Sequence, residues 1–126
     1  MVSAASLPQI VVLRTWMLIE AAMLGFASLV HSGHLVAGYA HAQARTAEAV
    51  IALVLVLAIA SAWSRPERTR WFAVSAQGFA LAGTLLGVAM IAIGIGPRTD
   101  VDIVYHAVLL WVLVAGLGFS IRWQRD

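Results

Sequence analysis

The sequence predicts an all-α integral membrane protein whose four transmembrane helices form one antiparallel up-down bundle. Of its 126 residues, 62% are hydrophobic and only 11% are charged, and the mean hydropathy is +0.91. A soluble domain carries charge on about a quarter of its residues. Four apolar stretches approach the length of about 20 residues that crosses a bilayer. The short connections between them favour antiparallel neighbours in a single domain covering residues 1–126.

The boundaries of the four spans follow from local signals. The first is too long for the apolar core of a cleaved signal peptide, and Glu20 interrupts it, so we expect it to stay in the mature chain. Gly96-Pro97 marks a turn that ends the third span. Thr99, followed three residues later by Asp102, is a pattern that caps the start of a helix. We expect the spans to cover residues 10–33, 44–63, 71–95 and 102–122.

The arginines predict how the spans are oriented. Cytoplasmic loops carry an excess of positive charge. Two arginines, Arg45 and Arg98, fall on one side of the predicted topology. Six fall on the other side, namely Arg14, Arg65, Arg68, Arg70, Arg122 and Arg125. We therefore expect a multi-pass protein of a bacterial plasma (inner) membrane with both termini cytoplasmic.

A short self-similarity raises the alternative of two tandem helical hairpins. At an offset of 53 residues, Gly25-Phe26-Ala27 aligns with Gly78-Phe79-Ala80, and Arg45-Thr46 aligns with Arg98-Thr99. A true repeat would relate the two hairpins by a pseudo-two-fold axis along the membrane normal. Chance similarity in an alanine-rich chain is the other reading.

All four histidines fall at the predicted outer face. His31, His34 and His41 lie in the first outer loop and its flanks, and His106 lies about one turn into the fourth helix. Two carboxylates, Glu48 and Asp102, are expected at the same depth. Imidazole with carboxylate suits a transition metal such as zinc, copper or iron. The chain has no cysteine, so thiolate metal sites are excluded.

The sequence thus predicts a small polytopic membrane protein that binds a transition metal ion or metal cofactor at its outer face. The expected ligands are His31, His34, His41, Glu48, Asp102 and His106. Haem held between His31 and His106, in an electron-transfer protein, is the alternative cofactor. The same residues also have structural readings: His34 and His41 as solvated loop residues, Asp102 as a helix cap, and Glu48 paired with Arg45. Whether the protein is an enzyme stays open, because no substrate is readable.

Glu20 is expected near the bilayer midplane, where an ionised carboxylate is costly unless it is paired, hydrated or protonated. Its expected partners are Gln77 or Thr84 on the third helix, and we expect Glu20 with Gln77 to form a buried proton or polar relay. A midplane glutamate on the first of four short helices resembles the layout of the small multidrug resistance transporters. That resemblance implies a proton-coupled transporter or channel-like homo-oligomer. The histidine-bearing outer loop departs from the family's pattern.

Two further predictions concern partners. Gly83 and Gly87 have the GxxxG spacing that lets membrane helices approach closely, which favours a homo-oligomer or an accessory subunit of a membrane complex. The lipid bilayer is the other expected partner. No Gly-rich phosphate loop and no basic stripe with interleaved aromatics is present, so no nucleic-acid partner is expected.

Overall fold

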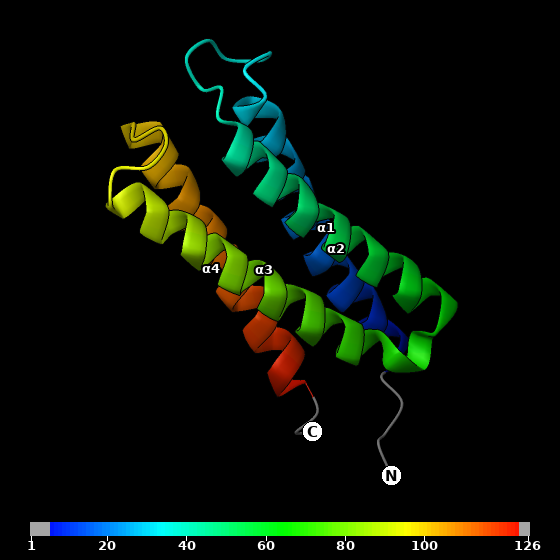
Figure 1. The fold of residues 1–126 in the computed structure, drawn as a ribbon. Helices are drawn as coiled ribbons and strands as arrows, with labels where there is room; N and C mark the ends of the chain where they lie inside the picture. The colour runs from blue at the N-terminus through cyan, green and yellow to red at the C-terminus, as the bar shows by residue number, and fades with distance from the viewer. Residues whose placement is uncertain (1–5, 124–126) are drawn as a thin grey trace.

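The computed structural model describes residues 6–123, and every regular element in this range is helical (Figure 1). Each predicted span corresponds to one long helix. The first and third spans end a few residues earlier than predicted, because glycines with positive φ follow the two helices, Gly33 at +80° and Gly94 at +89°. Glycine adopts this left-handed conformation without a side-chain clash and commonly ends helices. The elements are α1 (Leu7–His31), α2 (Ala42–Ser64), the 3-10 helix η1 (Pro66–Arg68), α3 (Thr69–Ala92) and α4 (Asp100–Arg122).

The starts of α2 and α4 are each capped by a side chain. Thr99 Oγ1 accepts a hydrogen bond from the backbone N–H of Asp102 at 3.2 Å, which confirms the predicted cap of α4. His41 Nδ1 accepts one from the backbone N–H of Ala44 at 3.1 Å at the start of α2. These bonds satisfy amide groups that have no partner inside the helix.

The two connecting loops lie at one end of the bundle. Residues 32–41 join α1 to α2, and residues 93–99 join α3 to α4, at the top of Figure 1. We call this the loop end. At the opposite end, here the turn end, η1 joins α2 to α3, and α1 begins and α4 finishes there. The predicted positions of both termini and of Arg125 concern residues outside the described range.

Two arginines tie the helices together at the turn end. Arg14 of α1 donates from Nη2 to the carbonyl oxygen of Ala62 at 2.5 Å, and its guanidinium lies 4.4 Å from the ring centroid of Trp63. Arg70 of α3 donates to the carbonyl oxygens of Ser120 at 3.0 Å and Ile121 at 3.1 Å. The accepting carbonyls belong to the last turns of α2 and α4, where no intrahelical donor reaches them and the helix dipole is negative. Each arginine thus stabilises the end of a neighbouring helix.

The four long helices are apolar on their outer faces as well as in the core. Leu13, Met17 and Leu55 are almost wholly buried, whereas Leu18 and Trp111 are 59% and 76% exposed. A helix that is hydrophobic all round suits a core or a membrane span. By length and composition, four helices in the described residues are able to cross a membrane.

The helix boundaries do not follow the 53-residue offset. Helices α2 and α4 are each 23 residues long and begin at Ala42 and Asp100, an offset of 58. At an offset of 53, Arg45 inside α2 aligns with Arg98, which lies in the loop before α4. The match at Gly25 and Gly78 does pair the first helices of the two hairpins, α1 and α3, so the tandem-hairpin alternative stays a prediction.

Candidate ligand-binding site

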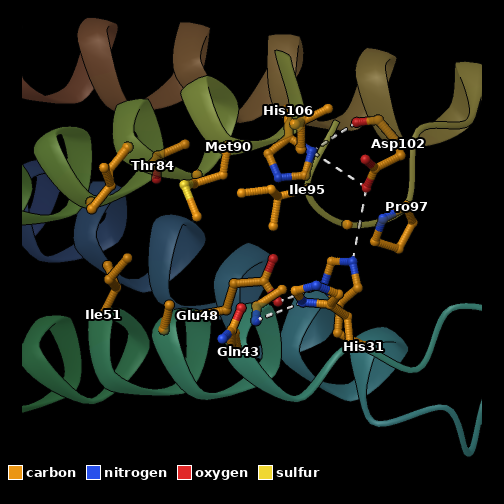
Figure 2. A pocket seen from close by; sticks show the side chains of 18 of the residues that line it. His31, Gln43, Glu48, Ile51, Thr84, Met90, Ile95, Pro97, Asp102 and His106 are labelled. Carbon is orange, nitrogen blue, oxygen red and sulfur yellow. Dashed lines mark hydrogen bonds and ion pairs between the residues drawn. The ribbon is translucent and has the colours of Figure 1, made fainter. Parts of the chain in front are cut away.

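A cavity of about 320 Å³ opens between the helices at the loop end (Figure 2). Most of its wall is apolar, from Leu24, Ile51, Met90, Ile91, Ile95 and Leu109. Its polar groups come from all four long helices and from the residue that caps α2. Small-molecule sites are typically such clefts, with apolar walls and a few placed polar groups.

The first polar pair in the cavity joins α1 to α2. His31 is the last residue of α1, and its Nδ1 lies 2.7 Å from Glu48 Oε2 on α2. Both residues are buried, at 5% and 8% exposure. A buried carboxylate needs such a partner, because it has left the water that would otherwise solvate it. Glu48 therefore pairs with His31 and not with Arg45, the alternative partner that the sequence suggested.

The second polar pair lies on α4. His106 Nδ1 is 2.8 Å from the backbone oxygen of Asp102 and 3.5 Å from its carboxylate Oδ1. A backbone carbonyl oxygen can only accept a hydrogen bond, so the Nδ1–H of His106 is the donor. Asp102 Oδ1 is also 3.9 Å from His31 Nε2, so the two pairs face each other across the cavity, as Figure 2 shows.

Two buried oxygen atoms in the cavity wall have no hydrogen-bond partner. They are Asp102 Oδ2 and Thr84 Oγ1, on residues that are 6% and 5% exposed. An unsatisfied buried polar atom costs about 1–3 kcal/mol. Native structures keep few such atoms, so each is a candidate hydrogen-bond partner for a bound molecule.

The other two predicted ligands, His34 and His41, lie farther from the two polar pairs. His41 lies at the rim, where its Nδ1 caps α2 and its Nε2 is near Gly96. His34 is exposed in the loop after α1, and its Nδ1 lies 3.2 Å from Ser32 Oγ. Because α1 ends at His31, His34 does not continue the helical stripe that was expected to carry it toward the bundle.

The predicted ligands do not surround a common point. Among residues 6–123, no group of three or more histidine, cysteine, aspartate or glutamate side chains is arranged to hold a metal ion. Between the two histidines of the haem alternative, Asp102 Oδ1 lies 3.9 Å from His31 Nε2 and 3.5 Å from His106 Nδ1. Metal and haem binding stay predictions.

A second polar cluster lies around Glu20, which is one turn of α1 before the cavity-lining residue Leu24. Gln77 Nε2 donates to Glu20 Oε1 at 3.0 Å, and Ser120 Oγ donates to Gln77 Oε1 at 2.6 Å. The predicted contact between Glu20 and Gln77 is therefore present, and its role as a relay stays a prediction. Ser120 was missed because serine is common in membrane helices and gives no spacing signal by itself.

One glycine of α3 and one of α4 pack closely against other helices of the same chain. A Cβ at Gly83 would lie 2.7 Å from Ile51 Cδ1, so α3 packs closely against α2 at this position, whereas a Cβ at Gly87 would meet no atom within 4 Å. A Cβ at Gly116 would lie 2.2 Å from Glu20 Oε1. The close approach that the GxxxG spacing predicts at Gly83 thus occurs between helices of one chain, and a homo-oligomer stays a prediction.

Compared with known proteins, the chain matches no family model, no curated protein and no solved structure.

Proposed function

We propose that the four helices cross a membrane with the loop end outside. Five described arginines belong to the turn end or its flanking turns, against two at the loop end, Arg45 and Arg98. This asymmetry is the one that places positive charge in the cytoplasm. A bacterial plasma membrane is the proposed location, and the exposed apolar side chains of all four helices would contact its lipid.

We further propose that the loop-end cavity binds a small amphipathic cation, an amine with an apolar body. The observation that carries this proposal is the pairing of apolar walls with Asp102, whose buried Oδ2 has no partner. The cavity wall includes two carboxylates, three imidazoles and no lysine or arginine. An ammonium group would satisfy Asp102 Oδ2 with a charge-assisted hydrogen bond, which is about twice as strong as a neutral one.

A transition metal ion is the second candidate for the same cavity. Four side chains of suitable chemistry favour a metal in this cavity, namely His31, Glu48, Asp102 and His106. Imidazole and carboxylate are the ligands that zinc uses in the absence of cysteine. His31 is able to bind an ion through Nε2, which lies 3.9 Å from Asp102 Oδ1, while Nδ1 keeps its hydrogen bond to Glu48, as metal-binding histidines commonly do. An open coordination position on such an ion would give the site a route to enzymatic activity.

Thermal unfolding of the detergent-solubilised protein tests the proposal with three probes. We expect n-hexylamine to raise the unfolding temperature, and n-hexanol, which has the same chain length without the charge, to leave it unchanged. A ligand at 100 times its dissociation constant stabilises the folded state by about 2.7 kcal/mol. Equal effects of amine and alcohol would contradict the proposal. Stabilisation by Zn²⁺ but not by the amine would favour the metal.

A further inference from the structure

The seam between α2 and α3 is closed at one end of the cavity and open beside it. Gly83 of α3 packs against Ile51 of α2, where a Cβ would lie 2.7 Å from Ile51 Cδ1. Gly87, one turn nearer the loop end, also lines the cavity, yet a Cβ there would meet no atom within 4 Å. In Figure 1, α2 and α3 meet at the turn end and diverge toward the loop end. The two helices therefore touch at Gly83 and have separated at Gly87.

The residues on both edges of this seam are exposed. Leu86 of α3 and Ala47 of α2 line the cavity, and both are also exposed, Leu86 by 67%. A residue that lines a cavity and is exposed at the same time lies at its mouth. The exposed residues Val50 of α2 and Leu85 of α3 are apolar too. In the proposed membrane, this mouth therefore faces lipid hydrocarbon.

Hydrogen bonds close the seams of α1 with its two other neighbours beside the cavity. Tyr105 of α4 donates to the backbone oxygen of Met23 on α1. The bond between His31 and Glu48 joins α1 to α2. A ligand in the cavity thus has no comparable opening on the sides that α1 forms.

The two loops meet above the cavity at the loop end. The hydroxyl oxygen of Tyr39 lies 2.8 Å from Thr99 Oγ1, which joins the first loop to the residue that caps α4. A Cβ at Gly96 would lie 3.5 Å from His41 Nε2, so the start of α2 also contacts the second loop. These contacts narrow the path from the cavity to water, whereas the seam between α2 and α3 is open toward lipid.

The position of Asp102 suits the head of an amphipathic amine that lies in a bilayer. Asp102 is in the first turn of α4, at the loop end, where the proposed membrane has its polar surface. An alkylamine in a bilayer keeps its charged head at the surface and its chain in hydrocarbon, as lysine side chains of membrane helices do. A water molecule takes up about 30 Å³ of liquid, and a methylene group is of similar size. The cavity of about 320 Å³ therefore holds on the order of ten such groups, fewer than a long chain has.

We propose that the cavity takes long-chain alkylamines from the bilayer, with the ammonium at Asp102 and the chain passing between α2 and α3 at Gly87 into the lipid. This inference rests on the proposed amine site and adds the class of ligand. The part of the chain outside the cavity stays in hydrocarbon, as it does in the free membrane. Extra chain length should therefore cost nothing when the amine binds from lipid.

A series of chain lengths tests the proposal in phosphatidylcholine nanodiscs, whose lipid head has no N–H to donate to Asp102. The probes are n-hexylamine, n-decylamine and n-hexadecylamine at equal mole fraction in the lipid, and the control for each is the alcohol of the same length. The fluorescence of the five tryptophans reports the unfolding temperature. We expect the rise that an amine causes beyond its alcohol to be at least as large for n-hexadecylamine as for n-hexylamine.

The outcomes separate this inference from the amine site on which it rests. A closed cavity excludes chains longer than it can hold. Loss of the amine-specific rise at n-hexadecylamine, with the rise for n-hexylamine retained, would overturn the inference and leave the amine site standing. The absence of an amine-specific rise at every chain length would overturn the amine site and the inference together.

Gly87→Leu tests the exit of the chain, because it places a side chain in the open space between α2 and α3. We expect it to reduce the amine-specific rise by about half or more for n-hexadecylamine and by less for n-hexylamine, whose chain fits inside the cavity. Gly78→Leu is the matched control, since Gly78 is also on α3, a Cβ there meets no atom within 4 Å, and it does not line the cavity. Equal losses for the short and the long amine, or no loss for either, would overturn the exit at Gly87. The chain-length series on native protein stands if Gly87→Leu fails to fold.

Discussion

The Gly116→Ala variant is expected to lose about 2 kcal/mol of unfolding free energy, the range found when an extra methyl group is forced into a packed core. A Cβ at this position would lie 2.2 Å from Glu20 Oε1 and 2.8 Å from Gln77 Nε2. Accommodating it requires Glu20 to move and to loosen its bond with Gln77. Chemical denaturation in detergent measures the loss.

Gly118→Ala is the matched control on the same helix. A Cβ at Gly118 meets no atom within 4 Å. Alanine favours a helix over glycine by about 1 kcal/mol, so we expect this control to be neutral or slightly stabilising. Shortening Glu20 to alanine in the Gly116→Ala background should recover part of the loss. Equal stability of the two single variants would show that α4 does not approach Glu20 as closely as the structure indicates.

Asp102→Asn is expected to weaken n-hexylamine binding about 10- to 100-fold, since one charge-assisted hydrogen bond contributes about 1.5–3 kcal/mol. Asparagine keeps the shape of the side chain and removes the negative charge that faces the cavity. Titration calorimetry of the detergent-solubilised protein measures the affinity. Asp100→Asn is the control, because Asp100 is exposed in the first turn of α4 and does not line the cavity. The same loss in both variants would assign the effect to net charge and not to the cavity.

Helix number and position could be predicted because each span is a continuous apolar run. Hydrocarbon sets the length of a membrane helix, so composition and length identify it without any tertiary contact. The cap at Thr99 could be predicted as well, because its donor lies three residues away at Asp102. Local signals of this kind survive in a single sequence.

Contacts between helices were predicted less well. Glu20 and Gln77 could be paired because each is the rare polar residue of its span at a similar depth. His31 and Glu48 were predicted to share one ligand set, but their direct hydrogen bond was not predicted, since Arg45 is nearer to Glu48 in sequence. His34 was placed on the stripe of α1 because nothing but a glycine, Gly33, signals that the helix has already ended. The faces that two helices turn toward each other depend on side-chain packing between them, which the sequence of either helix alone does not determine.

Photolabelling with an alkylamine that carries a terminal diazirine tests the central claim most directly, because the adducts report where the apolar body of the amine lies. We predict adducts on the cavity walls, at Ile51, Met90 and Ile95, that are suppressed by excess n-hexylamine and reduced in Asp102→Asn. Adducts spread over the exposed faces of the helices, at residues such as Leu57, with no suppression by n-hexylamine, would contradict the claim.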